Sequence, residues 1–206
     1  MSSSPATLYV IAAPSGAGKT TLVRSLLDRN PRLKFSVSYT TREKRETEVD
    51  GRDYFFVDEE RFLQLKETGE LLESALVFGN YYGTGRTRVE QQLEKGSHVI
   101  LEIDWQGARQ VRESVPGCVT IFILPPARQE LERRLRDRRT DSDEVIARRL
   151  QEAHGDMSHW DEFEFVIIND ELDAAVGELE AILHGDGAAN RSSRPELRQK
   201  LEEILV

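Results

Sequence analysis

One stretch near the start of the chain, LYVIAAPSGAGKT at residues 8–20, decides the fold. Its apolar, β-branched first half predicts a buried strand, and the apolar period that follows predicts a helix over residues 19–28. The small residues between them fit G-x-x-x-x-G-K-[ST] except at the first position, where Ala13 replaces glycine. A strand, a glycine-rich loop and a helix in this order predict a phosphate-binding loop. The alternative is an ordinary strand-to-helix turn rich in small residues.

Each part of this loop has a physical role in holding phosphate. Gly16 and Gly18 let the main chain curl with its N–H groups inward, and the helix N-terminus adds partial positive charge. Lys19 can reach the β- and γ-phosphates of a nucleotide, while the Thr20 hydroxyl can bind Mg²⁺ directly. The expected ATP-binding residues are Ala13, Pro14, Ser15, Gly16, Ala17, Gly18, Lys19, Thr20 and Thr21.

Length and composition exclude several classes of protein. A chain of 206 residues favours a single α/β domain with insertions over two domains. The net charge of −9 disfavours a nucleic-acid binder or a protein of anionic membranes, and one cysteine excludes a disulfide framework within the chain. The N-terminal residues lack the pattern of a signal peptide, and no window has the length of a membrane span, so we expect a cytoplasmic protein.

The remaining pattern predicts a parallel α/β core with two additions. Apolar strands over residues 99–104, 119–124 and 165–168 alternate with helices, whereas short strands over 54–57 and 71–77 precede the turn-rich sequence GNYYG at 79–83. We expect a three-layer phosphate-loop core (residues 5–37, 94–127 and 154–206), a mixed-β insertion (38–93) and a helical lid (128–153).

The end of the chain predicts a linker and a last helix. Residues 185–192 are small and polar, and the following sequence predicts an amphipathic helix that begins near Ser193. This helix packs either on its own core or on a second copy of the chain.

Two acids end the strand over residues 99–104. Glu102 and Asp104 are two residues apart, so both side chains should leave the same face of the sheet at its carboxyl edge. A carboxylate there can hold Mg²⁺ through water or contact a substrate. The alternative is that these acids merely close a strand at the surface.

Basic residues gather in two further segments. Arginines are frequent over residues 128–149, where Arg134 and Arg138 share one helix face and could close over ATP as a lid. A solvated helix of alternating charges is the alternative reading. The sequence TTREKR at 40–45, together with Tyr54 and Tyr82, could bind a second phosphate, as transfer between two nucleotides requires.

The order of these motifs carries a family resemblance. After the phosphate loop come SxTTRxxR (38–45), GNYYGT (79–84), EIDxxG (102–107) and ND (169–170), and with them the chain resembles the guanylate kinase family from about Thr7 to Leu183. The resemblance implies a GMP-binding insertion, an arginine lid and transfer of the γ-phosphoryl group of ATP to GMP, giving ADP and GDP with Mg²⁺. Alanine at the position of Ala13 is also found in the family.

The resemblance further implies roles for single residues. The phosphate of GMP would be bound by Arg42, Arg45, Tyr54 and Tyr82. Its base would be read by Ser38, Glu73, Thr84 and Glu102. Asp104 would lie near GMP, Mg²⁺ and the reacting phosphates, and Asn169 would lie near the adenine of ATP. The catalytic set implied in this way is Lys19, Arg42, Asp104, Arg134, Arg138 and Arg149.

Two positions depart from the family pattern. The residues expected to read the base nevertheless complement the hydrogen-bonding groups of guanine. Glu102 stands where the family usually has aspartate, and Arg139 stands where a glycine often follows the second lid arginine. Guanine presents donors at N1–H and the 2-amino group and an acceptor at O6. A carboxylate at Glu73 with the hydroxyls of Ser38 and Thr84 complements that pattern, whereas adenine has no N1–H.

Two rival functions share this core. One is a kinase of another small phosphate ester, which would not need the base-reading residues. The other is a guanylate-kinase-like interaction module that binds phosphopeptides, which would not need an intact Gly18-Lys19-Thr20. We therefore expect ATP and GMP as partners, with no nucleic acid and no membrane, and either a monomer or a homodimer.

Overall fold

The computed structural model describes residues 6–137 and 143–205, which form an α/β fold with eight α-helices and two sheets. The expected fold class is confirmed. Contacts group the chain into two compact units, one of Met1–Val10 and Pro31–Val119, the other of Ile11–Asn30 and Thr120–Val206. The division into core, insertion and lid stays a prediction. Within the described residues, no helix combines the length and the apolar character needed to cross a membrane.

The first sheet carries the strands that were expected from apolar runs. Its order is β2 (Leu33–Phe35), β7 (His98–Glu102), β1 (Leu8–Ala12), β8 (Val119–Leu124) and β9 (Phe165–Ile168). The pairs β2 with β7 and β8 with β9 are parallel. Every residue of β1 is buried, because its five side chains are apolar or aromatic and both faces of a parallel sheet are covered.

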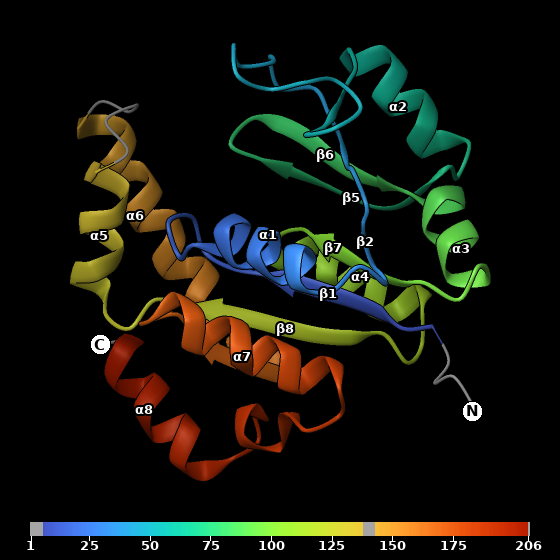
Figure 1. Cartoon of the computed structure of the whole chain (residues 1–206). Helices are drawn as coiled ribbons and strands as arrows, with labels where there is room; N and C mark the ends of the chain where they lie inside the picture. The colour runs from blue at the N-terminus through green and yellow to red at the C-terminus, as the bar shows by residue number, and fades with distance from the viewer. Residues whose placement is uncertain (1–5, 138–142, 206) are drawn as a thin grey trace. The chain divides into compact units, whose positions relative to one another are not determined.

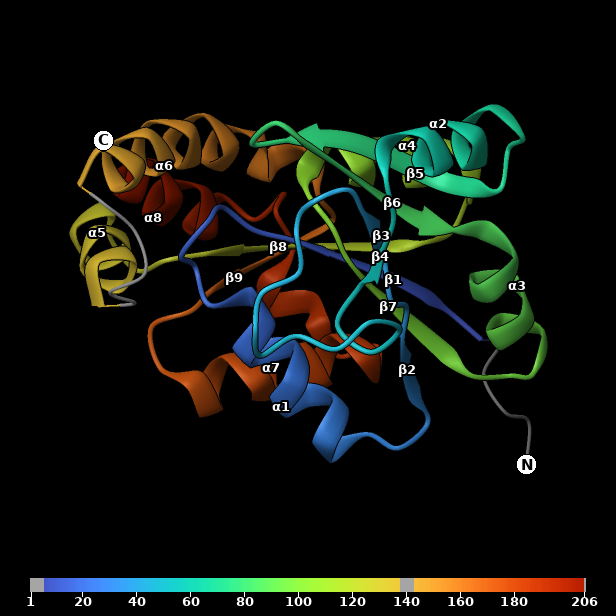
Figure 2. The ribbon, with the colours of Figure 1, turned by 90° about the horizontal axis from the view of Figure 1, so that it is seen from above.

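Helices of the second unit pack through apolar stripes. Helix α1 (Lys19–Arg29) buries Leu22, Val23 and Leu26, and lies beside α7 (Leu172–Leu183) in Figure 1. Figure 2 shows α5 (Arg128–Asp137) next to α6 (Asp143–Met157). These two helices share an apolar cluster of Leu131, Leu135, Ile146 and Ala153.

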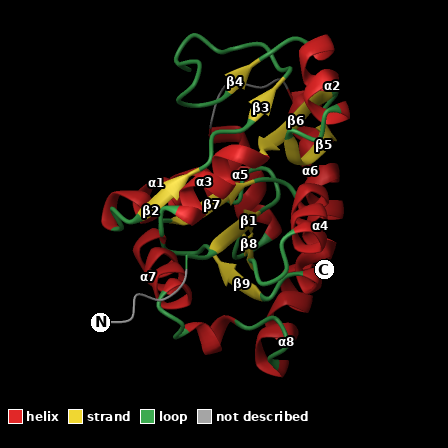
Figure 3. Cartoon of the chain, turned by 90° about the vertical axis from the view of Figure 1, so that its right-hand side faces the viewer, coloured by secondary structure: helices red, strands yellow, loops and turns green. Residues whose placement is uncertain are grey.

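The first unit contains a second, mixed sheet, drawn with its helices in Figure 3. Its order is β4 (Phe55–Phe56), β3 (Tyr39–Thr40), β6 (Asn80–Gly85) and β5 (Leu71–Val77). Helix α2 (Glu59–Glu67) begins where Asp58 accepts a hydrogen bond from the amide of Arg61, at 2.8 Å. Phe62 of this helix stacks on Tyr81 of β6, with ring centroids 5.3 Å apart.

Two expectations about this unit need correction. The sequence GNYYG was expected to be turn-rich, but residues 80–83 belong to strand β6, and the turn is confined to Phe78 and Gly79, with φ of 51° and 78°. Helix α3 (Arg86–Glu94) follows directly. The strand expected over residues 99–104 stops short of Asp104, because that residue caps helix α4 (Trp105–Ser114). The preceding strand therefore ends at Glu102.

The C-terminal segment is more structured than its composition predicted. Residues 185–192 were expected to form a linker, but they include a 3₁₀ helix, Gly187–Asn190, and Asn190 donates to Glu178 at 2.7 Å. Helix α8 (Pro195–Leu205) buries Leu201 and Ile204 within this chain, as the first of the two alternatives required. A second 3₁₀ helix, Ser158–Glu162, contributes Trp160, whose ring lies under the guanidinium of Arg198.

Candidate nucleotide-binding sites

The phosphate loop lies between β1 and α1 in the second unit. Gly16 and Gly18 have φ of 93° and 89°, a left-handed conformation that glycine adopts without strain. The amide of Ala17 donates to the carbonyl of Pro14 at 3.2 Å, which closes the curl of the loop. Gly18 is the N-cap of α1 and supplies no side-chain hydrogen bond to the first turn. The helix terminus is therefore the kind of site that binds an anion through main-chain N–H groups.

Asn169 and Arg134 hold this loop through hydrogen bonds to its main chain. The Asn169 side chain, which is 6% exposed, donates through Nδ2 to the carbonyl of Ala17 at 2.7 Å. Arg134 donates to the carbonyls of Asn169 and Ala17, at 3.0 and 3.4 Å. A Cβ at Gly18 would overlap Nδ2 of Asn169, so the loop needs glycine there for space as well as for φ. The structure thus brings Asn169 and Arg134 to the predicted ATP loop.

An ion pair fixes the Arg134 side chain on α5. Its Nε donates to Oε1 of Glu130 at 2.7 Å, and Arg133 donates to both oxygens of the same carboxylate. Hydrogen bonds from Arg133 and then Arg134 lower the pKa of Glu130 to about 2. Glu130 therefore stays ionised at neutral pH and limits the rotamers of Arg134.

For the other described residues predicted to act on ATP in this unit, the structure gives the helix position and the degree of burial. Lys19 is half-buried at the start of α1, and Thr20 and Thr21 are exposed there. Arg149 is half-buried in α6, while Arg138 lies outside the described residues.

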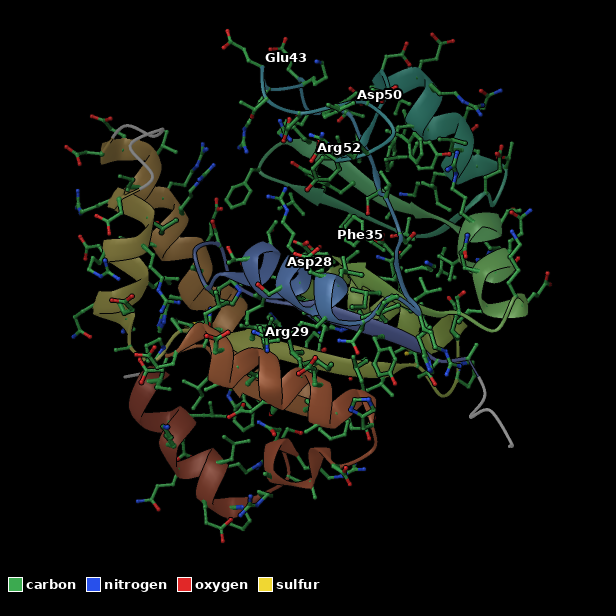
Figure 4. All side chains as sticks on the ribbon, viewed as in Figure 1. Asp28, Arg29, Phe35, Glu43, Asp50 and Arg52 are labelled. Atoms are coloured by element: carbon green, nitrogen blue, oxygen red, sulfur yellow. The ribbon has the colours of Figure 1, made fainter. Side chains whose placement is uncertain are left out.

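A guanidinium and two tyrosines form a cluster in the first unit. Arg42 lies 5.5 Å from the ring centroid of Tyr54, and the rings of Tyr54 and Tyr82 are 5.9 Å apart, edge to face. Arg42 donates to the Glu43 carbonyl and to Oε1 of Glu48, both at 2.6 Å. Figure 4 labels Glu43, together with Asp50 and Arg52, in the segment that joins β3 to β4. Three of the four residues predicted to bind the GMP phosphate therefore lie together.

The fourth, Arg45, joins the cluster through its main chain. Its amide donates to Oε2 of Glu48 at 2.8 Å, while its side chain is 65% exposed and reaches only to 4.0 Å from Oε1. Glu48 thus ties both predicted arginines together. Glu48 was not among the residues predicted from the sequence, although an acid six residues after Arg42 in a loop of mixed charge could have indicated it.

The electrostatics of this cluster suit an anion. Burial would raise the pKa of Glu48, but the hydrogen bonds from Arg42 and from the Arg45 amide outweigh it and lower that pKa. Burial first, and then the negative charge of Glu102, raise the pKa of Tyr54 to about 12. Tyr54 is therefore a protonated hydroxyl donor at neutral pH beside a permanently charged guanidinium. Glu102, the half-buried last residue of β7, is thus close enough to act electrostatically on Tyr54.

A buried carboxylate and hydroxyl lie on the hairpin of β5 and β6. Glu73 is 4% exposed, Thr84 is fully buried, and the two residues are partners in the strand register. The Thr84 hydroxyl donates to Oε1 of Glu73 at 2.7 Å. Ser38, also buried, precedes β3, and its carbonyl accepts from the amide of Phe55 at 2.9 Å. A charged group is buried at such a position only where partners compensate its lost hydration.

Asp104 has a different position from the expected one. It does not extend the strand beside Glu102 but caps α4, where Oδ1 accepts from the Gly107 amide at 2.8 Å. Oδ2 accepts from the Gln106 side chain at 3.1 Å. The expectation that Glu102 and Asp104 leave one strand face was wrong because strand β7 ends between them.

The chain thus has a glycine-rich loop of phosphate-binding geometry between β1 and α1 and, in the first unit, a cluster of one arginine and two tyrosines. This combination is typical of the class of phosphate-loop nucleotide kinases. The family model described as guanylate kinase matches residues 5–186. The chain belongs to the guanylate kinase family, whose members phosphorylate GMP using ATP.

Individual relatives cover nearly the whole chain. The guanylate kinase of Alkalilimnicola ehrlichii is 50% identical over 201 residues, which are 98% of this chain and 99% of the relative. That of Aromatoleum aromaticum is 56% identical over 179 residues, which are 87% of this chain and 88% of the relative. The crystal structure of guanylate kinase from Anaplasma phagocytophilum matches with a TM-score of 0.76 at 35% identity, covering 97% of this chain and 96% of that one.

Proposed function

We propose that this chain transfers the γ-phosphoryl group of ATP to GMP through the two groups of residues described above. The triphosphate would lie against the amides of the Gly16–Gly18 turn, with Lys19 on its terminal phosphates and Arg134 near the loop. Asn169 would lie near the adenine. Arg138 and Arg149 complete the proposed lid arginines.

The acceptor phosphate would be held by Arg42, Tyr54 and Tyr82, with Arg45 reaching it from the exposed side of the loop. At neutral pH the terminal phosphate of GMP is already a nucleophile, so no side chain has to remove a proton first. The protein's contribution is alignment, charge neutralisation and exclusion of water. Arginine suits this role because its planar donors match phosphate oxygens and its charge persists at every working pH.

Mg²⁺ fits the oxygen donors that the proposal assigns to it. The Thr20 hydroxyl and the Asp104 carboxylate are hard ligands, and Mg²⁺ typically uses one or two protein oxygens, phosphate oxygens and water. Among residues 6–137 and 143–205, no group of three or more acidic, histidine or cysteine side chains is arranged to hold a metal ion. We infer direct binding by Thr20 and a water-mediated contact to Asp104. When bound, the ion would neutralise phosphate charge.

The observation that carries the choice of acceptor is the buried Glu73 carboxylate that accepts from Thr84. One oxygen has this hydroxyl donor, and a guanine edge offers two N–H donors to a carboxylate. Adenine lacks the N1–H, so its binding would leave a buried acceptor badly paired. Such a mismatch is expected to give discrimination of about 10⁴.

A coupled assay of ADP release tests this proposal. GMP, AMP, CMP and UMP are supplied in turn with ATP, and GMP is expected to be preferred by about 10⁴ in kcat/KM. Glu73→Gln should raise the KM for GMP strongly while the KM for ATP stays nearly unchanged. Glu70→Gln, at an exposed residue directly before the same strand, is the matched control. An unchanged KM for GMP in Glu73→Gln would contradict the base-reading role.

The cellular location and the oligomeric state are also proposals. Both substrates belong to the cytoplasmic nucleotide pool, which supports a cytoplasmic enzyme. The choice between monomer and homodimer stays a prediction, and light scattering of the purified protein decides it.

A further inference from the structure

The first turn of α4 is packed against the carboxylate of Glu73. Helix α4 lies on strand β5, and Glu73 is buried in that strand with Oε1 bonded to Thr84 at 2.7 Å. Gly107, in this first turn, faces the carboxylate. A Cβ built on Gly107 would overlap Oε2 of Glu73 and lie 3.1 Å from its Cδ. Any side chain at position 107 would therefore displace the Glu73 carboxylate.

The backbone conformation does not explain this glycine. Gly107 lies within α4 and is absent from the residues of positive φ, so an L-amino acid could adopt its backbone angles. Glycine is also the least favourable residue of a helix interior apart from proline, whereas alanine is the most favourable. The local preference of the helix thus opposes glycine, and the space taken by Glu73 is what chiefly requires it, with Oδ1 of Asp104 a looser neighbour at 3.2 Å from the added Cβ.

The same two turns of α4 position two other groups. The amide of Gly107 donates to Oδ1 of Asp104 at 2.8 Å. One turn later, Gln110 accepts from the Ser74 amide at 3.0 Å and donates to the Ser74 carbonyl at 2.8 Å. Ser74 directly follows Glu73 in β5. The two bonds from Gln110 therefore fix the position of that strand along the helix axis. Gly107 then sets how closely the carboxylate can approach.

We propose that Gly107 is a specificity-determining position, where the missing side chain admits the Glu73 carboxylate to the plane in which it reads the acceptor base. Gln110 is the positioning residue that keeps β5 in register with that opening. This inference rests on the proposed role of Glu73 in binding GMP. It adds that the guanine preference depends on a residue that contacts no substrate.

Gly107→Ala is the test, with Gly155→Ala as the matched control. Gly155 also lies inside a helix, α6, and a Cβ there would meet nothing within 4 Å. Gly107→Ala is expected to raise the KM for GMP by about tenfold or more and to lower the GMP-over-AMP ratio of kcat/KM by a similar factor, because a displaced carboxylate loses its alignment. The KM for ATP should stay unchanged in both variants, and Gly155→Ala should match the parent throughout.

A double-mutant cycle separates this role from simple destabilisation. Glu73→Ala removes the overlapping atoms, so the melting temperature lost in Gly107→Ala should return in Glu73→Ala/Gly107→Ala. In the Glu73→Ala background, Gly107→Ala should no longer change the KM for GMP. If Gly107→Ala does not fold, recovery of folding in the double variant supports the steric coupling, and Gln110→Ala, with a KM for GMP raised about threefold, carries the kinetic test.

Two outcomes overturn the inference. One is a folded Gly107→Ala enzyme with the parent's KM for GMP and the parent's GMP-over-AMP ratio. The other is full additivity of the two substitutions. Failure of the proposed function is recognised separately, because Glu73→Gln would then leave the KM for GMP unchanged whatever happens at position 107.

Discussion

The two regions that we propose to bind phosphate are built in opposite ways. The loop between β1 and α1 uses main-chain groups from one stretch, residues 13–20, whose shape depends on the positive φ of Gly16 and Gly18. The cluster in the first unit uses side chains from separate segments, Arg42, Tyr54 and Tyr82. The first region is therefore defined by backbone geometry, and the second by the side chains that hold one arginine in place.

This difference predicts different weaknesses. A main-chain cradle keeps its N–H groups whatever the charge of its neighbours. It is therefore damaged by lost backbone freedom or by loss of Lys19. A side-chain cluster depends on countercharge, because Arg42 is fixed by Glu48 and by the Glu43 carbonyl. Substitutions that remove a countercharge outside the substrate contacts should therefore weaken only the second region.

The largest effect is expected from Lys19→Ala in the main-chain cradle. Removing a cation that neutralises charge in the transition state should lower kcat by about 10³ or more. The fold should persist, because Lys19 is half-buried and belongs to no apolar cluster among the described residues. Steady-state kinetics measure kcat, and a thermal melt measures whether the fold persists. Lys34→Ala, at an exposed lysine, is the control; an equal loss there would show a non-specific effect of charge.

Glu48→Gln tests the side-chain cluster. The amide keeps the size of the carboxylate but removes the charge that holds Arg42 at 2.6 Å and accepts from the Arg45 amide at 2.8 Å. We expect the KM for GMP to rise about tenfold with kcat at saturating GMP nearly retained, since a charge-assisted hydrogen bond is lost. The KM for ATP serves as the internal reference, and exposed Glu46→Gln in the same loop is the matched control. A fall in kcat with an unchanged KM for GMP would refute the positioning role.

Asn169→Ala should have a smaller effect on the cradle. The substitution removes the Nδ2 bond to the Ala17 carbonyl and leaves a buried acceptor that depends on the longer contact from Arg134. We expect a loss of about 1–3 kcal/mol in unfolding free energy and a KM for ATP raised about threefold. Chemical denaturation and ATP titration measure these quantities. Asp170→Ala, at the exposed next residue, should change neither quantity. An unchanged KM for ATP in Asn169→Ala would refute the role of Asn169 in shaping the ATP loop.

The smallest effect is a pH dependence of the second region. The pKa of Glu48 is lowered from its ordinary value of 4.5, so its contribution to stability is fully present above about pH 4.5 and is lost as the pH falls through the folded-state pKa. The melting-temperature gap between the parent and Glu48→Gln should therefore be constant from pH 6 to 8 and shrink in acid. A gap that stays constant down to about pH 3 would argue against the ion pair with Arg42.

Sequence predicted best what is local and periodic. Strands β5, β8 and β9 have the bounds that their apolar runs suggested, and the phosphate loop could be read because its groups are contiguous. Helix α2 began after Asp58, as a capping aspartate predicts. The family resemblance then supplied Arg42, Tyr54, Glu73 and Tyr82, which propensity alone would not have connected.

Sequence failed where tertiary contacts decide. The glycine and asparagine of GNYYG indicate a turn, yet pairing with β5 holds these residues in β6. Asp104 was placed on a strand because Ile103 continues the apolar run, whereas its carboxylate caps α4. Neither the ion pair of Glu48 nor the opening at Gly107 leaves a periodic signal, since each depends on which segments meet in the fold.

The two hydrogen bonds from Gln110 to Ser74 have a consequence for the protein in concentrated solution. Strand β5 is the last strand of its sheet, and it exposes Leu76 and precedes exposed Phe78. Such an edge is a template for pairing with another chain. The Gln110 amide occupies the N–H and C=O of Ser74 as a neighbouring strand would. The main-chain groups of Ser74 are thereby closed to pairing with a strand of another chain.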